Sequence, residues 1–161
     1  MIEDFREALK KLVYPVAIVS ALDSSNKNSA ITVSSLTSIS FEPPSVLVCI
    51  NKESSFAGSI KENANVNINL LHISQKDISI KCSVPDLKEQ RFDNTSWSYD
   101  ENNIPYLKSS QSVLFSNIQS YSSFGTHYIV VMRIFKVLNF INNSEPLLYG
   151  NQNYIDNIKL D

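Results

Sequence analysis

Six hydroxyl side chains fall within ten residues of this chain, a density that could line a binding site. They lie between Ile31 and Ser40, ahead of a Pro43-Pro44 turn and an apolar run that ends at Ile50. Hydroxyls beside backbone amides can hydrogen-bond a flat heteroaromatic ring with polar edges and a phosphate tail. A surface loop rich in Ser and Thr is the other interpretation, because hydroxyl clusters are common in turns. Composition alone does not decide between the two.

A second group of residues, suited to an anion, follows the apolar run. Lys52 precedes Ser54 and Ser55, and these precede a predicted short helix over residues 56–62. A cation, two hydroxyls and the free amides of a helix N-terminus together favour a phosphate. The alternative is that Ser54 or Ser55 only caps the helix and that Lys52 is solvated.

The counts of glycine, histidine and cysteine exclude several kinds of site. Three glycines cannot supply a Rossmann fingerprint or a P-loop, so any nucleotide is bound in another way. His72 and His127 have no companion ligands at metal spacing, and we expect no metal site. Cys49 and Cys82 lie far apart in apolar runs and are predicted to be buried thiols.

The bulk properties are those of an ordinary globular domain, which we expect to span residues 1–161. The chain is 43% hydrophobic and 19% charged, and it has no run of about 18 apolar residues that would predict a membrane span. A net charge of -2 without a basic stripe argues against nucleic acid as a partner. The acidic start lacks the features of a secretory signal, so we expect a cytoplasmic protein.

Hydrophobic periodicity predicts many strands and few helices. Residues 2–13 place their apolar side chains on one helical stripe, and Pro15 ends that helix. A further helix is predicted over residues 74–82. The predicted strands cover residues 16–19, 31–40, 45–51, 65–70, 112–119, 127–140 and 147–149. We therefore expect a mainly β protein with short helices (α+β), in which the sheet closes into a barrel and hides its edges.

The order of these motifs resembles that of the short-chain flavin reductases, the reductase components of two-component flavin-dependent monooxygenases. The resemblance runs from about Phe5 to Ile155, and its most specific piece is the Thr32 to Ser40 segment followed by Pro-Pro and an apolar strand. The other matching pieces are Phe5-Arg6-Glu7-Ala8-Leu9, Lys52 with Ser54-Ser55, Val66-Asn67-Ile68-Asn69-Leu70-Leu71, Arg91-Phe92, Gly125-Thr126-His127 and Pro146-Leu147-Leu148-Tyr149 with Tyr154. The resemblance implies the FMN-binding split β-barrel fold.

The resemblance also implies that the hydroxyl-rich segment lies along the isoalloxazine ring of a flavin. Thr32, Ser34, Ser35 and Ser38 would then bind the nitrogens and carbonyl oxygens of the ring. Donors at the N1/C2 carbonyl edge stabilise the anionic reduced flavin, which is the main electronic influence a protein has on this cofactor.

Further cofactor-binding residues are implied on either side of those hydroxyls. Val33 and Ile39 are expected to point their side chains into the core while their backbone lines the ring. Lys52, Ser54 and Ser55 would hold the phosphate of the flavin. For these three residues, the resemblance thus favours anion binding over simple helix capping.

His127 is the catalytic residue that the resemblance implies. The family usually has Gly-Asp-His where this chain has Gly125-Thr126-His127, and its histidine faces the flavin where the nicotinamide stacks. His127 would orient the nicotinamide carboxamide. Thr126 lacks the charge that could hold the tautomer of the histidine. From the residues alone, His127 could equally begin a strand and do no more.

Tyr154 is implied to close over the nicotinamide. In the family a Gly-x-Tyr turn does this, but Gln152 stands here in the place of that glycine, and the nearest glycine is Gly150. Tyr149 and Tyr154 could instead be aromatic residues of the core or of a dimer interface.

The resemblance implies a homodimer with the flavin near its interface. The apolar strand over residues 128–138 is compatible with such an interface. Arg91 belongs to a matching piece, but an arginine on a loop is usually a solvated charge or part of a dimer salt bridge. We assign it no catalytic step.

The implied activity is that of an NAD(P)H-dependent flavin reductase. Hydride would pass from NADH or NADPH to FMN or FAD, and the reduced flavin would go to a partner monooxygenase. A flavin-binding split-barrel protein with little or no reductase activity is an alternative, since Thr126 and Gln152 alter the nicotinamide side. A third is an enzyme of the pyridoxamine-phosphate-oxidase type, but that needs a basic pocket which the charges here do not form.

Overall fold

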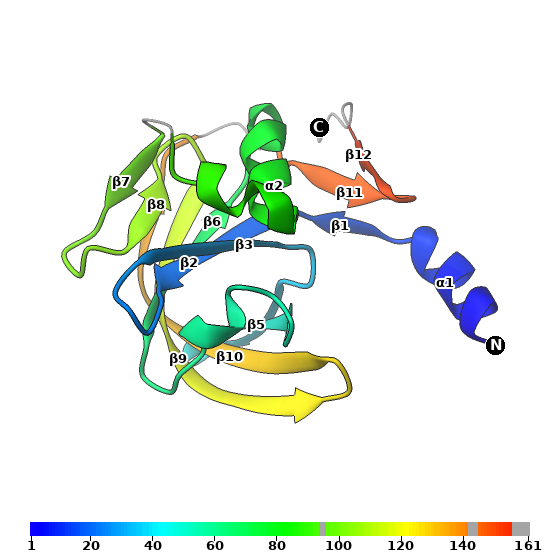
Figure 1. The fold of residues 1–161 in the computed structure, drawn as a ribbon, viewed down its shortest axis with the longest axis horizontal. Helices are drawn as coiled ribbons and strands as arrows, with labels where there is room; N and C mark the ends of the chain where they lie inside the picture. Colours follow the sequence, from blue (N-terminus) through cyan, green and yellow to red (C-terminus); the bar gives the residue numbers. More distant parts are fainter. Residues whose placement is uncertain (94–95, 142–144, 156–161) are drawn as a thin grey trace.

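The fold is built around one antiparallel sheet of seven strands in the order β3-β2-β6-β9-β10-β5-β4 (Figure 1). The computed structural model describes residues 1–93, 96–141 and 145–155. The strands of this sheet are β2 (Ala17–Leu22), β3 (Asn28–Val33), β4 (Thr37–Phe41), β5 (Pro44–Asn51), β6 (Asn65–Leu70), β9 (Ser112–Phe124) and β10 (His127–Asn139). Most of the predicted strands are thus confirmed, and β9 and β10 form a hairpin whose arms are 13 residues long.

The sheet rolls into a barrel that is split between its two edges. The edge strands β3 and β4 are separated in the chain only by residues 34–36, so the sheet must curl to bring them together. Ser35 bridges the gap, because its Oγ accepts a hydrogen bond from the Cys49 amide (2.9 Å) and donates one to the Cys49 carbonyl (3.1 Å). No ladder joins β3 to β4 in the described part of the chain.

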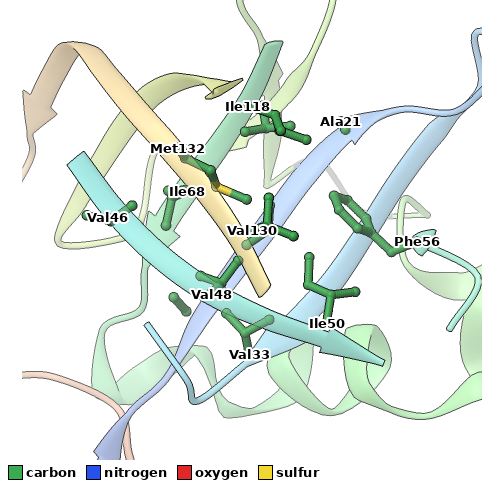
Figure 2. Packing of buried hydrophobic residues seen from close by; sticks show 13 residues of the cluster. Ala21, Val33, Val46, Val48, Ile50, Phe56, Ile68, Ile118, Val130 and Met132 are labelled. Carbon is green, nitrogen blue, oxygen red and sulfur yellow. The ribbon is translucent and has the colours of Figure 1, made fainter. Parts of the chain in front are cut away.

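Apolar side chains from the strands fill the inside of the barrel. Strand side chains alternate between the two faces of a sheet, and in β2 this sends Ala17, Val19 and Ala21 inward. Figure 2 shows the inner residues pointing toward one another from facing strands. Those it labels are Ala21, Val33, Val46, Val48, Ile50, Phe56, Ile68, Ile118, Val130 and Met132.

A second apolar cluster lies on the outer face of β2 and β3, beneath α2 (Lys76–Ser83). Val16 and Ile18 supply its strand side, Ile78 and Cys82 its helix side, and Trp97 is buried at one end. The 3₁₀ helices η2 (Ile73–Gln75) and η3 (Pro85–Gln90) flank α2, and β7 (Trp97–Tyr99) pairs with β8 (Pro105–Leu107) nearby. α2 therefore packs over β3 (Figure 1), and η3 packs against α2.

The two ends of the described chain meet in a small sheet beside the barrel. β1 (Val13–Pro15) pairs with β11 (Leu148–Gly150), which pairs with β12 (Asn153–Ile155). The helix α1 (Ile2–Lys10) precedes this sheet and projects away from the barrel (Figure 1). None of its residues is buried.

Two sequence predictions are wrong in detail. Residues 31–40 are not one strand, because β3 pairs with β2 whereas β4 pairs with β5. Val33 is buried as expected, but the side chain of Ile39 is 48% exposed because it lies at an irregularity in the edge strand β4.

The predicted helix over residues 56–62 is also wrong. Only a single 3₁₀ turn forms there, η1 (Ala57–Ser59), and neither Ser54 nor Ser55 caps it. Phe56 is fully buried at the end of the barrel, so tertiary packing rather than helix propensity fixes this segment. A helix N-terminus therefore contributes nothing to anion binding here.

Candidate functional site

The first hollow of the site lies where β3 ends beneath α2. It has a volume of about 320 Å³, and its walls come from β3, α2 and the β11–β12 hairpin. Its lining residues are Val16, Thr32, Ser34, Ile80, Ser83, Val84, Tyr149 and Tyr154. The structure thus brings three of the predicted flavin-site residues together: Thr32, Ser34 and Tyr154.

Hydrogen bonds to one residue of α2, Ser79, fix two walls of this first hollow. The Thr32 Oγ1 donates to the Ser79 carbonyl at 2.7 Å, and the Tyr154 hydroxyl shares a 2.8 Å hydrogen bond with the Ser79 Oγ. The ring of Tyr149 packs edge-on against that of Tyr154, with 5.3 Å between their centroids. Polar hydroxyls therefore face an aromatic wall, as a planar heteroaromatic ligand requires.

The second hollow lies next to the first, since Ser83 lines both. It has a volume of about 280 Å³ and is lined by Ile31, Glu53, Ser54, Ser55, Cys82, Ser83, Pro85, Lys88 and Arg91. Two of the residues predicted to bind phosphate, Ser54 and Ser55, are among these. Two cations from η3 and the turn after it lie opposite them.

Arg91 is a buried cation, and the expectation that it is a solvated charge is wrong. It is only 5% exposed, and its guanidinium donates to backbone carbonyls. Nε bonds the Lys81 carbonyl at 3.0 Å, and Nη1 bonds the Ala30 carbonyl at 2.8 Å and the Ser55 Oγ at 3.1 Å. No carboxylate of the described residues forms an ion pair with it. A buried charge without a counter-charge is costly, so this guanidinium favours an anion in the hollow.

Ser54 adds an unpaired polar atom to the same hollow. Its Oγ is inaccessible to solvent and has no hydrogen-bond partner within the described ranges. Such an atom costs about 1–3 kcal/mol unless a ligand or water satisfies it. Cys82, on the α2 side, is apolar in character, because burial raises the pKa of its thiol to about 12.

Lys52 and His127 belong to a different corner, at the tip of the β9–β10 hairpin. The Lys52 ammonium donates to the Gly125 carbonyl at 2.6 Å and to the Ser123 hydroxyl, and it lies 5.6 Å from the centre of the Tyr128 ring. His127 is exposed, and its Nδ1 shares a 2.8 Å hydrogen bond with the Thr126 Oγ1. Neither side chain lines the two hollows.

The remaining predicted site residues lie on the barrel wall. Ser35 is engaged with Cys49 across the split, as described above. Ser38 and Ile39 are exposed on β4, outside both hollows, and Val33 is part of the barrel core. The structure therefore groups Thr32, Ser34, Ser54, Ser55 and Tyr154 along one cleft and leaves the other predicted residues apart from it.

Sequence reasoning missed the positive charges of the cleft. The predicted site residues do not include Arg91, Lys88 or Ser83, although Arg91 belongs to a piece that matches the family. A signal for Arg91 was present in its neighbour Phe92 and in Trp97, because two large apolar residues around an arginine indicate a packed segment. Trp97 in fact donates to the Arg91 carbonyl at 2.8 Å.

Among the described residues no group of three or more His, Cys, Asp or Glu side chains could hold a metal ion.

Comparison with known proteins assigns the family. The model of the Flavin reductase like domain matches residues 9–156, and the chain belongs to this family. The reductase component of the FADH(2)-dependent resorcinol hydroxylase of Rhizobium sp. strain MTP-10005 is 26% identical over 94% of this chain and 85% of its own length. The NADH-dependent FMN reductase RutF of Stutzerimonas stutzeri is 28% identical over 94% of this chain and 86% of its own.

A solved structure agrees with the fold. The flavin reductase domain protein of Arthrobacter sp. FB24 superposes with a TM-score of 0.88, covering 100% of this chain and 98% of that one at 21% identity. The split β-barrel architecture is therefore confirmed. Within the described ranges, no helix has both the length and the apolar character that a membrane crossing needs.

Proposed function

We propose that this protein is an NAD(P)H-dependent flavin reductase that passes reduced FMN or FAD to a partner monooxygenase. The observation that carries the proposal is the second hollow, which is lined by Ser54, Ser55, Lys88 and the buried Arg91 and lies next to a first hollow lined by hydroxyls and aromatic rings. Family membership and the relatives named above support the same activity.

The donor set of the cleft fits a flavin. Thr32 and Ser34 would face the polar edge of the isoalloxazine ring, and the ring of Tyr154 would close its far side. Ser54, Ser55 and Arg91 would hold the phosphate, since a guanidinium and short hydroxyls are strong donors to phosphate oxygens. The bound flavin accepts hydride at N5 from a nicotinamide and carries it to the oxygenase.

The residues of the chain would act by positioning and by excluding water. No side chain has to move a proton in the hydride transfer itself. His127 would orient the carboxamide of the nicotinamide, and its Nδ1 shares a hydrogen bond with the Thr126 Oγ1. His127 lies opposite Asn51 on β5, two residue pairs along the ladder from Cys49, which binds Ser35. Strand β5 thus links the hairpin tip to Ser35, the residue that follows Ser34 of the cleft.

Steady-state oxidation of NADH or NADPH with added FMN or FAD tests the activity. We expect turnover that requires flavin and saturates with it. No flavin-dependent rate above background with either nicotinamide would contradict the proposal. The alternative is a flavin-binding protein with little or no reductase activity, which the replacement of the family's Asp by Thr126 favours. Tight flavin binding without bleaching of the flavin absorbance by NADH or NADPH would select it.

We also propose that the protein is a cytoplasmic homodimer. Four aromatic residues of β4, β9 and β10 are exposed: Phe41, Tyr121, Phe124 and Phe135. In α1 the apolar stripe of Ile2, Phe5 and Leu9 is likewise exposed. A helix of nine residues is only marginally stable in water unless it packs against another surface. A second copy would cover both surfaces.

Light scattering tests the oligomeric state. We expect the mass of a dimer for the full chain and that of a monomer for the variant Phe5→Asp combined with Phe124→Asp. The double variant Lys61→Gln with Lys108→Gln makes the same total change of charge at two other exposed positions and serves as the control. A monomeric parent protein that turns over flavin would contradict the proposal.

A further inference from the structure

Three hollows are lined by successive residues of β3. The first meets the strand at Thr32 and Ser34, the second at Ile31, and a third at residues 28–30. At about 3.4 Å per residue, six residues of extended chain span about 20 Å. The line of hollows therefore continues past the phosphate end of the proposed flavin site, toward the turn between β2 and β3.

The second and third hollows share two cations. Lys88 and Arg91 line both of them, so any anion beyond the first phosphate would remain next to positive charge. The third hollow has a volume of about 320 Å³. It is lined by Asp23, Lys27, Asn28, Ser29, Ala30, Lys88, Glu89, Arg91 and Phe92.

The third hollow differs from the other two in offering both charges and an aromatic ring. The exposed Lys27 lines this hollow together with Lys88, and the carboxylates of Asp23 and Glu89 lie beside them. Asp23 accepts hydrogen bonds from the Lys27 and Ser25 amides at 2.9 and 2.8 Å through one oxygen only. These bonds lower the pKa of Asp23 below its ordinary value, so the carboxylate is ionised and can accept from hydroxyl or amino groups.

We propose that the third hollow binds the AMP half of FAD, and that FAD is therefore the preferred flavin of this protein. The inference rests on the proposed function, because it extends the same cleft. The second phosphate lies between Lys27 and Lys88. The ribose hydroxyls or the adenine amino group donate to Asp23, and the adenine lies against Phe92.

FMN has no group that reaches this hollow, whereas FAD adds an anion and several donors. Hydrogen bonds to charged groups are stronger than those between neutral groups. Even when exposure to solvent weakens these contacts, FAD binds at least about tenfold more tightly than FMN.

Isothermal titration of the full-length protein with FAD, FMN and riboflavin tests this inference. We expect FAD to bind about tenfold more tightly than FMN, and FMN more tightly than riboflavin. The variant Lys27→Glu should lose that advantage of FAD while its affinity for FMN stays unchanged. Lys61→Glu makes the same change of charge at an exposed position outside all three hollows, and it should leave both affinities unchanged.

Equal affinities for FAD and FMN in the parent protein would overturn the inference and leave the proposed function standing. So would a Lys27→Glu variant that weakens both flavins equally. If none of the three flavins binds, the proposed function fails and the inference fails with it. Competition with 5′-AMP gives a second readout, because AMP should displace FAD from the third hollow and leave the binding of riboflavin unaffected.

Discussion

The cleft along β3 and the tip of the β9–β10 hairpin both carry predicted site residues, but they differ in how their polar groups are satisfied. In the cleft, Ser54 Oγ is unpaired and Arg91 is buried without a counter-charge. At the hairpin tip, the Lys52 ammonium is already held by the Gly125 carbonyl. Backbone carbonyls hold both cations, but Arg91 is 5% exposed whereas Lys52 is only half-buried. A charge without a counter-charge costs more where it is buried, so binding an anion gains more in the cleft.

Replacing Arg91 should have the largest effect on the affinity of the cleft for FMN. In Arg91→Lys the charge remains but the planar fork that reaches several acceptors is lost. We expect FMN affinity to fall about 30-fold, or about 2 kcal/mol, while riboflavin affinity changes little. Parallel titrations with both ligands measure this, and an equal loss for riboflavin would mean that Arg91 acts only through the fold.

The buried thiol of the cleft should make stability depend on alkaline pH. Cys82 keeps its proton in the folded state up to about pH 12, whereas an unfolded cysteine loses it near about pH 8.5. The folded state then binds more protons, so stability falls as pH rises between these values, by up to about 1.4 kcal/mol per pH unit. Urea unfolding of the parent protein and Cys82→Ala measures the difference. The prediction is wrong if the free energies of unfolding of the parent protein and of Cys82→Ala change with pH in parallel.

A glycine at position 152, in the turn before Tyr154, should stabilise the protein. Gln152 has a φ of 63°, in the left-handed region that disfavours residues with a side chain. We expect Gln152→Gly to stabilise the protein by about 1 kcal/mol. Asn151, with a φ of 47°, tolerates this conformation better, so Asn151→Gly should gain less. Thermal unfolding compares the two variants, and a loss of stability in Gln152→Gly would be the contrary result.

Lys52 should matter least for flavin binding. Because its ammonium donates to the Gly125 carbonyl at the hairpin tip, we expect Lys52→Ala to change FMN affinity by less than about threefold, or about 0.6 kcal/mol. A loss comparable to that of Arg91→Lys would instead restore Lys52 as a phosphate ligand, as the sequence predicts. The same titration distinguishes the two outcomes.

Much of the fold could be predicted from the sequence because it depends on local patterns. The alternation in Asn65–Leu70 and the apolar run in Pro44–Asn51 define strands without knowledge of their partners. The break between β3 and β4 could not be predicted in this way. It depends on which strands pair, and Ser35 bridges that break through a contact 14 residues away in the chain.

The site was predictable only in part for the same reason. Thr32, Ser34, Ser54 and Ser55 lie within 24 residues of one another, and their hydroxyls are visible as a local cluster. Arg91 reaches Ala30 and Ser55 across 61 and 36 residues, so its burial is a property of the folded chain. The same holds for Tyr154, which meets Ser79 across 75 residues.

A crystal structure of the protein with FMN tests the central claim most directly. We predict the isoalloxazine ring between Ser34 and Tyr154 and the phosphate within hydrogen-bond distance of the Ser54 Oγ and the Arg91 guanidinium. A phosphate bound beside Lys52 at the hairpin tip, with the second hollow empty, would contradict the assignment of the cleft as the flavin site.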